Sequence, residues 1–155
     1  MPSGLHVGQP APDFTLPSTQ GEITLSRIAS ERKVAVAFYV EDNTPVCTSE
    51  LAALKGDYGL VQDLGAVVVA VSVDGLEAHQ DFSRRLGGAP FPLVSDANLE
   101  AARMYGVVDE TGKRSRRAIF VIDRGGVLVH EISWYSPANS GQYEEIFRAL
   151  GLQTG

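Results

Sequence analysis

The sequence of 155 residues contains a single cysteine, Cys47. One thiol cannot form a disulfide within the chain, so a secreted scaffold held together by disulfides is excluded. A dithiol oxidoreductase is excluded as well, because the segment CTSE that begins at Cys47 lacks the second cysteine of a Cys-x-x-Cys motif. A reducing compartment is therefore the simpler expectation.

Positive charge and long apolar segments are also scarce. There are 13 Lys and Arg against 19 Asp and Glu, which gives a net charge of −6 at pH 7, and an acidic surface argues against a nucleic-acid partner. The longest apolar run covers only residues 34–40, whereas a membrane span needs about 20 residues. The first ten residues lack the features of a signal peptide. We expect a soluble, cytoplasmic protein with no membrane partner.

Potential metal ligands are few and scattered. His6, His79 and His130 show no paired spacing with one another or with carboxylates, so we expect neither a metal nor another cofactor. His79 falls on a helical segment with polar neighbours. All three histidines are expected to be ordinary surface or strand residues.

The length and pattern predict one domain that spans residues 1–155. Residues 33–40 and 66–74 form apolar runs typical of strands buried on both faces. Between them, residues 44–64 carry apolar positions at helical spacing, which makes a β-α-β unit with a parallel crossover. The remaining expected elements are a short strand or strand end in 22–28, a helix in 76–86, an edge strand or strand start in 89–96, a short helix in 98–106, a polar loop in 109–117, a hairpin in 117–135 and a last helix in 140–151 with Ser140 as its N-cap. This order is typical of an α/β, thioredoxin-like fold with a central mixed sheet flanked by helices.

The position of Cys47 indicates more than a core residue. Thr44 is a good N-cap and Pro45 suits the first position of a helix, which places Cys47 about one turn inside. Unpaired backbone N–H groups and the helix dipole stabilise a thiolate there. The alternative is a small buried apolar residue, as most free cysteines are. Because the neighbours Thr44, Thr48, Ser49 and Glu50 are polar, we favour a pocket that holds a reactive thiol.

Residues 44–51, TPVCTSEL, resemble the active-site segment of the peroxiredoxins, especially of the one-cysteine type. The family pattern is Pro-x-x-x-Thr-x-x-Cys with a carboxylate three residues later, which Thr44, Cys47 and Glu50 match. RAIFVID places Arg117 at the family's arginine, and GQPAPDFTLP, VVVAVSVD and FPLVSD are similar to further family segments in the same order. The resemblance covers residues 7–133. Val40 departs from it, because the family has proline there.

The resemblance implies a thiol-dependent peroxidase that acts on hydrogen peroxide or small organic hydroperoxides. Cys47 would attack as a thiolate and become a sulfenic acid. Arg117 would stabilise the sulfur and the peroxide, and the Thr44 hydroxyl would accept from the peroxide O–H while it donates to the thiolate. The backbone N–H groups of Val46 and Cys47 would complete the donor set, and Glu50 would orient Arg117.

Some neighbours of these residues stay open to two interpretations. Arg116 competes with Arg117 for the catalytic role, and we choose Arg117 from the spacing, since only one of two adjacent strand residues can face the site. Arg116 is then expected to belong to a solvated loop. Tyr39 is more typical of a core position but could line the pocket. Trp134 and Tyr135 suit either a subunit interface or the edge of the core.

Regeneration follows from the cysteine count. Without a second, resolving cysteine, oxidised Cys47 must be reduced by an external thiol or by a thioredoxin-like or glutaredoxin-like partner. The resemblance also implies a homodimer. The alternative function is a thioredoxin-fold module without peroxidase activity whose cysteine forms mixed disulfides. Thr44 together with Arg117 favours the peroxidase, because a mixed-disulfide site needs neither.

Overall fold

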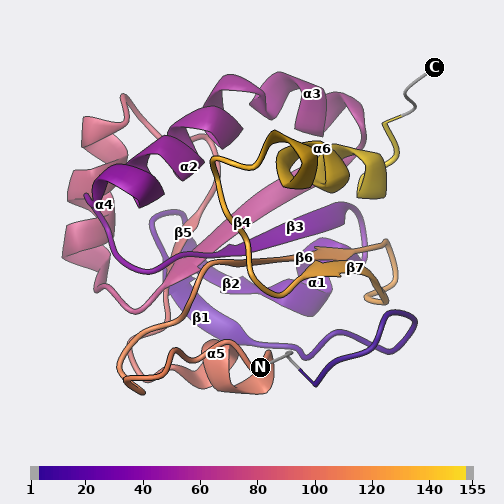
Figure 1. Ribbon diagram of the computed structural model, residues 1–155, viewed down its shortest axis with the longest axis horizontal. Helices are drawn as coiled ribbons and strands as arrows, with labels where there is room; N and C mark the ends of the chain where they lie inside the picture. Colours follow the sequence, from indigo (N-terminus) through magenta and orange to yellow (C-terminus); the bar gives the residue numbers. More distant parts are fainter. Residues whose placement is uncertain (1–3, 153–155) are drawn as a thin grey trace.

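A computed structural model of the chain describes residues 4–152, which form a seven-stranded sheet in the order β2-β1-β5-β4-β3-β6-β7 (Figure 1). The strands are β1 (Thr15–Ser18), β2 (Gly21–Thr24), β3 (Lys33–Phe38), β4 (Ala66–Ser72), β5 (Leu93–Ser95), β6 (Ala118–Ile122) and β7 (Leu128–Ile132). The helices are α1 (Leu25–Ala29), α2 (Pro45–Gly56), α3 (Tyr58–Asp63), α4 (Leu76–Arg85), α5 (Glu100–Met104) and α6 (Ser140–Ala149).

The central strands are buried on both faces, as their apolar runs predict. β3 pairs in parallel with β4 and antiparallel with β6, so the sheet is mixed. Alternate residues of β3 enter different cores: Ala35 and Ala37 pack with residues of α2, α4 and α6, whereas Val34, Val36 and Phe38 pack with residues of α1 and α5. Figure 1 shows these two groups of helices on opposite sides of the sheet. The predicted β-α-β unit and mixed sheet are confirmed.

The pairing of β3 with β6 brings two distant segments together. Phe38, the last residue of β3, lies opposite Ala118, the first residue of β6. Arg117 precedes Ala118 directly, so it enters the sheet beside the point where the chain leaves β3 for α2. Register thus decides which arginine can reach the start of that helix.

Several predicted element details are wrong. Residues 44–64 form two helices, because the chain breaks at Asp57, whose φ of −102° and ψ of 13° depart from helical values. Residues 22–24 form the end of β2, as the strand-end alternative predicts, but the strand does not continue to 28, because α1 begins at Leu25. Of the two alternatives for residues 89–96, the edge strand is wrong, since β5 lies between β1 and β4. The strand start agrees with the structure, because Pro90 and Pro92 precede Leu93, the first residue of β5. The N-cap of α6 is Asn139 rather than Ser140, since its side chain accepts a hydrogen bond from the Gln142 N–H at 3.1 Å.

None of the helices within residues 4–152 has the length and apolar character that crossing a membrane would require.

We expect Phe120→Ala to lower the free energy of unfolding by about 3–5 kcal/mol, the usual cost of removing a buried aromatic ring. Phe120 is fully buried in β6, and its ring centroid lies 5.0 Å from that of Tyr105 and 5.9 Å from that of Phe38. Met104→Ala on α5, which removes a side chain that is 36% exposed, is the control and should change stability by less than about 1 kcal/mol. Urea denaturation measures both, and equal effects would contradict the assignment of this core.

Candidate active site

The first turn of α2 forms as its sequence predicts. Pro45 occupies the start of the helix, and Thr44 precedes it in extended conformation, with φ −81° and ψ 149°. The Thr44 hydroxyl donates to the Glu41 carbonyl oxygen at 3.1 Å and does not cap the helix. The expected donation from Thr44 to sulfur is therefore not the bond seen here. The N–H groups of Val46 and Cys47 lie in the first turn, where a helix offers them no carbonyl partner.

Cys47 lies deeper than its polar neighbours suggest. Its exposed fraction is 0%, and it belongs to the apolar core on the α2 side of the sheet. The buried face of α2 is made of Cys47, Glu50, Leu51 and Leu54, which follow helical spacing. Thr48 is half-buried and Ser49 is exposed, so neither belongs to that face. The expectation of a polar pocket was wrong because the cysteine itself begins the buried stripe.

Arg117 supplies the polar contact of the sulfur. Its Nη1 donates to Cys47 Sγ at 3.9 Å, and its side chain is half-buried. Arg116 points elsewhere: its Nε donates to the Ser133 carbonyl at 2.7 Å, and its guanidinium lies 4.2 Å from the ring centre of Trp134. The prediction of a solvated Arg116 is wrong, since only 8% of it is exposed. Of the two arginines, Arg117 lies beside Cys47, as the spacing predicted.

Glu50 lies on the same helix face, but it does not hold Arg117 by a hydrogen bond. Both carboxylate oxygens of Glu50 and Nε of Arg117 are buried without a hydrogen-bond partner among the described residues. Burial raises the pKa of Glu50 to about 8, although the positive charge of Arg117 acts in the opposite direction. Glu50 is therefore mostly protonated at neutral pH. In that form it does not cancel the charge that Arg117 presents to Cys47.

A cavity of about 290 Å³ opens next to Arg117. Val40, which stands where the resemblance calls for proline, lines this cavity together with Trp134 and Tyr135. Tyr135 is buried, whereas Trp134 is 60% exposed, so the first is at the edge of the core and the second is on the surface. Tyr39 does not line this cavity: it is fully buried, and its hydroxyl donates to Asp42 at 2.6 Å.

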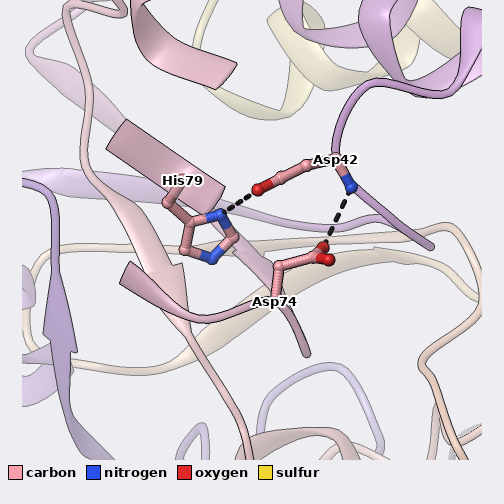
Figure 2. A group of neighbouring side chains, drawn as sticks. All are labelled: Asp42, Asp74 and His79. Carbon is pink, nitrogen blue, oxygen red and sulfur yellow. Dashed lines mark hydrogen bonds and ion pairs between the residues drawn. The ribbon is translucent and has the colours of Figure 1, made fainter. Parts of the chain in front are cut away.

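His79 was expected at the surface, and that prediction is wrong. It is fully buried on the inner face of α4, and its Nδ1 lies 2.8 Å from Asp42 Oδ2 (Figure 2). Its Nε2 lies 2.9 Å from the Val94 carbonyl oxygen. Phe82, three residues later, is also fully buried. The spacing of His79 and Phe82 could have predicted the burial of His79, because residues three apart share one face of a helix.

The other two histidines lie outside the core. His6 is exposed, and His130 on β7 is paired with Glu145 of α6 at 3.2 Å. A possible metal-ligand set is formed by Asp42, Asp74 and His79, whose donor atoms lie within 4.8 Å of one another. Each of these atoms already has a hydrogen-bond partner in the protein: the Asp42–His79 pair is internal, and Asp74 Oδ2 accepts from the Asp42 N–H and the Ser72 hydroxyl.

The order of these elements and the surroundings of Cys47 agree with a known family. Residues 7–131 match the model described as the AhpC/TSA family. The chain belongs to this family. It is 35% identical over 150 residues to a peroxiredoxin of Thermoplasma volcanium, covering 93% of this chain and 72% of that protein. It is 37% identical over 130 residues to the putative peroxiredoxin bcp of Coxiella burnetii, covering 80% and 85% respectively.

Solved structures agree with the family assignment. The crystal structure of peroxidoxin BcpB from Mycobacterium tuberculosis matches with a TM-score of 0.85 and 26% identity, covering 97% of this chain and 99% of that chain. The expected thioredoxin-like fold is thereby confirmed. Membership of the family makes the protein a peroxiredoxin, a thiol-dependent peroxidase, and its single cysteine fits the one-cysteine mechanism.

We expect Glu50→Gln to stabilise the protein increasingly as the pH rises. The folded state binds the Glu50 proton more tightly than the unfolded state, since its pKa is raised from 4.5 to about 8. The contribution of Glu50 to stability is therefore most favourable below pH 4.5 and is lost as the pH rises toward 8. Compared with Glu50→Gln, the wild type should lose up to about 1.4 kcal/mol of its free energy of unfolding for each pH unit between 4.5 and about 8.

Denaturation at several pH values measures this difference. Glu22→Gln on the exposed strand β2 is the control and should show no comparable pH dependence. A constant difference in stability between the wild type and Glu50→Gln would contradict the protonated state of Glu50.

Proposed function

We propose that Cys47 is the residue that attacks the peroxide and that Arg117 stabilises both the thiolate and the reacting oxygens. The observation that supports this most strongly is the contact between Arg117 Nη1 and Cys47 Sγ at 3.9 Å, in the first turn of α2. A guanidinium is always charged and offers several donors in fixed geometry. One donor can therefore remain on the sulfur while others take up charge on the substrate.

The reaction is a displacement at oxygen. The thiolate of Cys47 attacks the terminal oxygen of hydrogen peroxide or a small organic hydroperoxide, an S–O bond forms, and the O–O bond breaks. Sulfur loses two electrons and becomes a sulfenic acid, and the departing hydroxide or alkoxide takes up a proton to leave as water or an alcohol. Positive charge held beside the departing oxygen lowers the barrier to this step.

The remaining members of the site are assigned by position. The N–H groups of Val46 and Cys47 point out of the start of α2 and can donate to the substrate oxygens. The Thr44 hydroxyl, which donates to Glu41 in the resting structure, keeps lone pairs that can accept from the peroxide O–H. Glu50, which makes no hydrogen bond to Arg117, contributes by holding a proton: without a charge of its own it leaves the full positive charge of Arg117 for the sulfur and the substrate. The cavity next to Arg117 is the proposed route of entry, because Cys47 itself is closed to solvent.

Turnover needs a reductant from outside the chain. The sulfenic acid of Cys47 has no second cysteine within the sequence to condense with, so a small thiol or a thioredoxin-like or glutaredoxin-like protein must reduce it. Such a cycle requires a reducing compartment, which supports the cytoplasm.

The assembly is also a proposal. We propose that residues 1–155 act as one domain, supported by strands from both ends of the described chain that share one sheet. A homodimer is proposed from the family resemblance. Val46 and Trp134, which are 46% and 60% exposed, are apolar side chains that a subunit contact would cover.

One equivalent of hydrogen peroxide should add the mass of one oxygen atom to Cys47, or a thiol adduct when a small thiol is present. Mass spectrometry of the intact protein and of the peptide that contains Cys47 measures this. The variant Cys47→Ser should lose the rapid consumption of peroxide. A wild-type protein whose Cys47 stays unmodified under these conditions would end the peroxidase proposal.

Arg117→Ala should lower the second-order rate of peroxide reduction by about 10²–10³, the usual loss when a donor to developing charge is removed. Arg116→Ala is the matched variant, since Arg116 bonds to backbone carbonyls away from the sulfur, and it should keep most of the rate. Stopped-flow measurement of peroxide consumption separates the two. A larger loss in Arg116→Ala would show that the wrong arginine was assigned.

A further inference from the structure

A buried polar network lies at the loop that connects β3 to α2. Asp42 in this loop is 8% exposed, and His79 of α4 is 0% exposed. Asp42 Oδ1 accepts a hydrogen bond from the Tyr39 hydroxyl at 2.6 Å. Asp42 Oδ2 lies 2.8 Å from His79 Nδ1 (Figure 2). The reaction described above uses none of these three side chains.

The hydrogen-bond partners of His79 fix where its protons lie. The Val94 carbonyl can only accept, so Nε2, which lies 2.9 Å away, carries a hydrogen. Nδ1 and Asp42 Oδ2 would then be two acceptors at 2.8 Å unless one more proton lies between them. The pair therefore shares one proton, either as imidazolium with carboxylate or as imidazole with carboxylic acid. Such a bond is strong in a buried site and costly to break.

Asp42 is held on its backbone side as well. Its N–H donates to Asp74 Oδ2 at 2.9 Å, and Asp74 in turn accepts from the Ser72 hydroxyl at 2.7 Å. The chain then turns sharply at Asn43, whose φ of 62° is left-handed, a conformation that Asn tolerates better than most residues. Thr44 and the start of α2 follow at once. The position of Asp42 thus sets where the helix with Cys47 begins.

We propose that His79, acting through Asp42, is a positioning residue for Cys47. It anchors the loop between β3 and α2 on α4, and so it keeps the first turn of α2 at the distance from Arg117 that the sulfur contact requires. This inference rests on the proposed role of Cys47 in peroxide reduction. It gives a function to a buried histidine that neither binds peroxide nor touches the sulfur.

Two amide substitutions at position 79 separate the bond to Asp42 from the bond to Val94. The amide nitrogen of Asn occupies about the place of Nδ1, so His79→Asn can still donate to Asp42. The amide nitrogen of Gln occupies about the place of Nε2, so His79→Gln keeps the Val94 bond and loses the Asp42 bond. Both variants introduce a polar amide into the same buried site. If His79 only stabilised the fold, His79→Asn and His79→Gln should show the same rate of Cys47 oxidation.

We expect His79→Gln to lower the second-order rate of Cys47 oxidation by hydrogen peroxide by about tenfold to a hundredfold, the usual result of a small misplacement of reacting groups. His79→Asn should stay within about threefold of the wild type. Hydrogen exchange should show weaker protection of residues 43–48 in His79→Gln than in His79→Asn. Equal rates in both folded variants and the wild type would overturn the proposal.

Variants at Asp42 keep the test decisive if substitution of His79 prevents folding. Asp42→Asn can donate to Nδ1 and accept from Tyr39, so it should retain the rate. Asp42→Ala can do neither, and it should lose as much as His79→Gln does. If Asp42→Ala reacts as fast as Asp42→Asn, the inference is wrong. A wild-type protein that does not react with peroxide would instead refute the proposed function itself.

Discussion

The site depends on one contact between helix α2 and the residue before strand β6, the 3.9 Å approach of Arg117 Nη1 to Cys47 Sγ. The two residues are 70 positions apart in the chain, and strand register brings them together. Phe38 pairs with Ala118, which places the arginine before β6 beside the loop that begins α2. A slip of one residue would turn Arg117 to the other face and present Arg116 in its place.

Burial gives this contact its energetic weight. A thiolate in the core loses its hydration, so it needs a charged donor close by. The same burial makes a carboxylate costly, and Glu50 therefore holds its proton with a pKa of about 8. A protonated Glu50 carries no charge, so it leaves the positive charge of Arg117 uncompensated beside the sulfur. Around this centre, the Asp42–His79 pair anchors the loop that leads into the helix.

Much of this could be predicted from the sequence. The apolar runs of β3 and β4 and the Thr44-Pro45 start of α2 are local signals, and the structure confirms these elements. The family spacing predicted which of the two arginines lies beside Cys47, and the catalytic role of Arg117 stays a prediction. The burial of His79, Arg116 and Glu50 was missed because polar residues are usually exposed. Their partners come from distant segments: Val94 and Asp42 for His79, and the Ser133 carbonyl for Arg116. No single-sequence pattern indicates such pairs. The break at Asp57 was missed because the apolar spacing continues across it.

The most direct test of the central contact is the ultraviolet absorbance of the thiolate at neutral pH, measured as the difference between the wild type and Cys47→Ser. If Arg117 stabilises a charged sulfur, the wild type shows this absorbance, and Arg117→Ala loses most of it while remaining folded. An absorbance that is absent from the wild type, or unchanged in Arg117→Ala, would contradict the account.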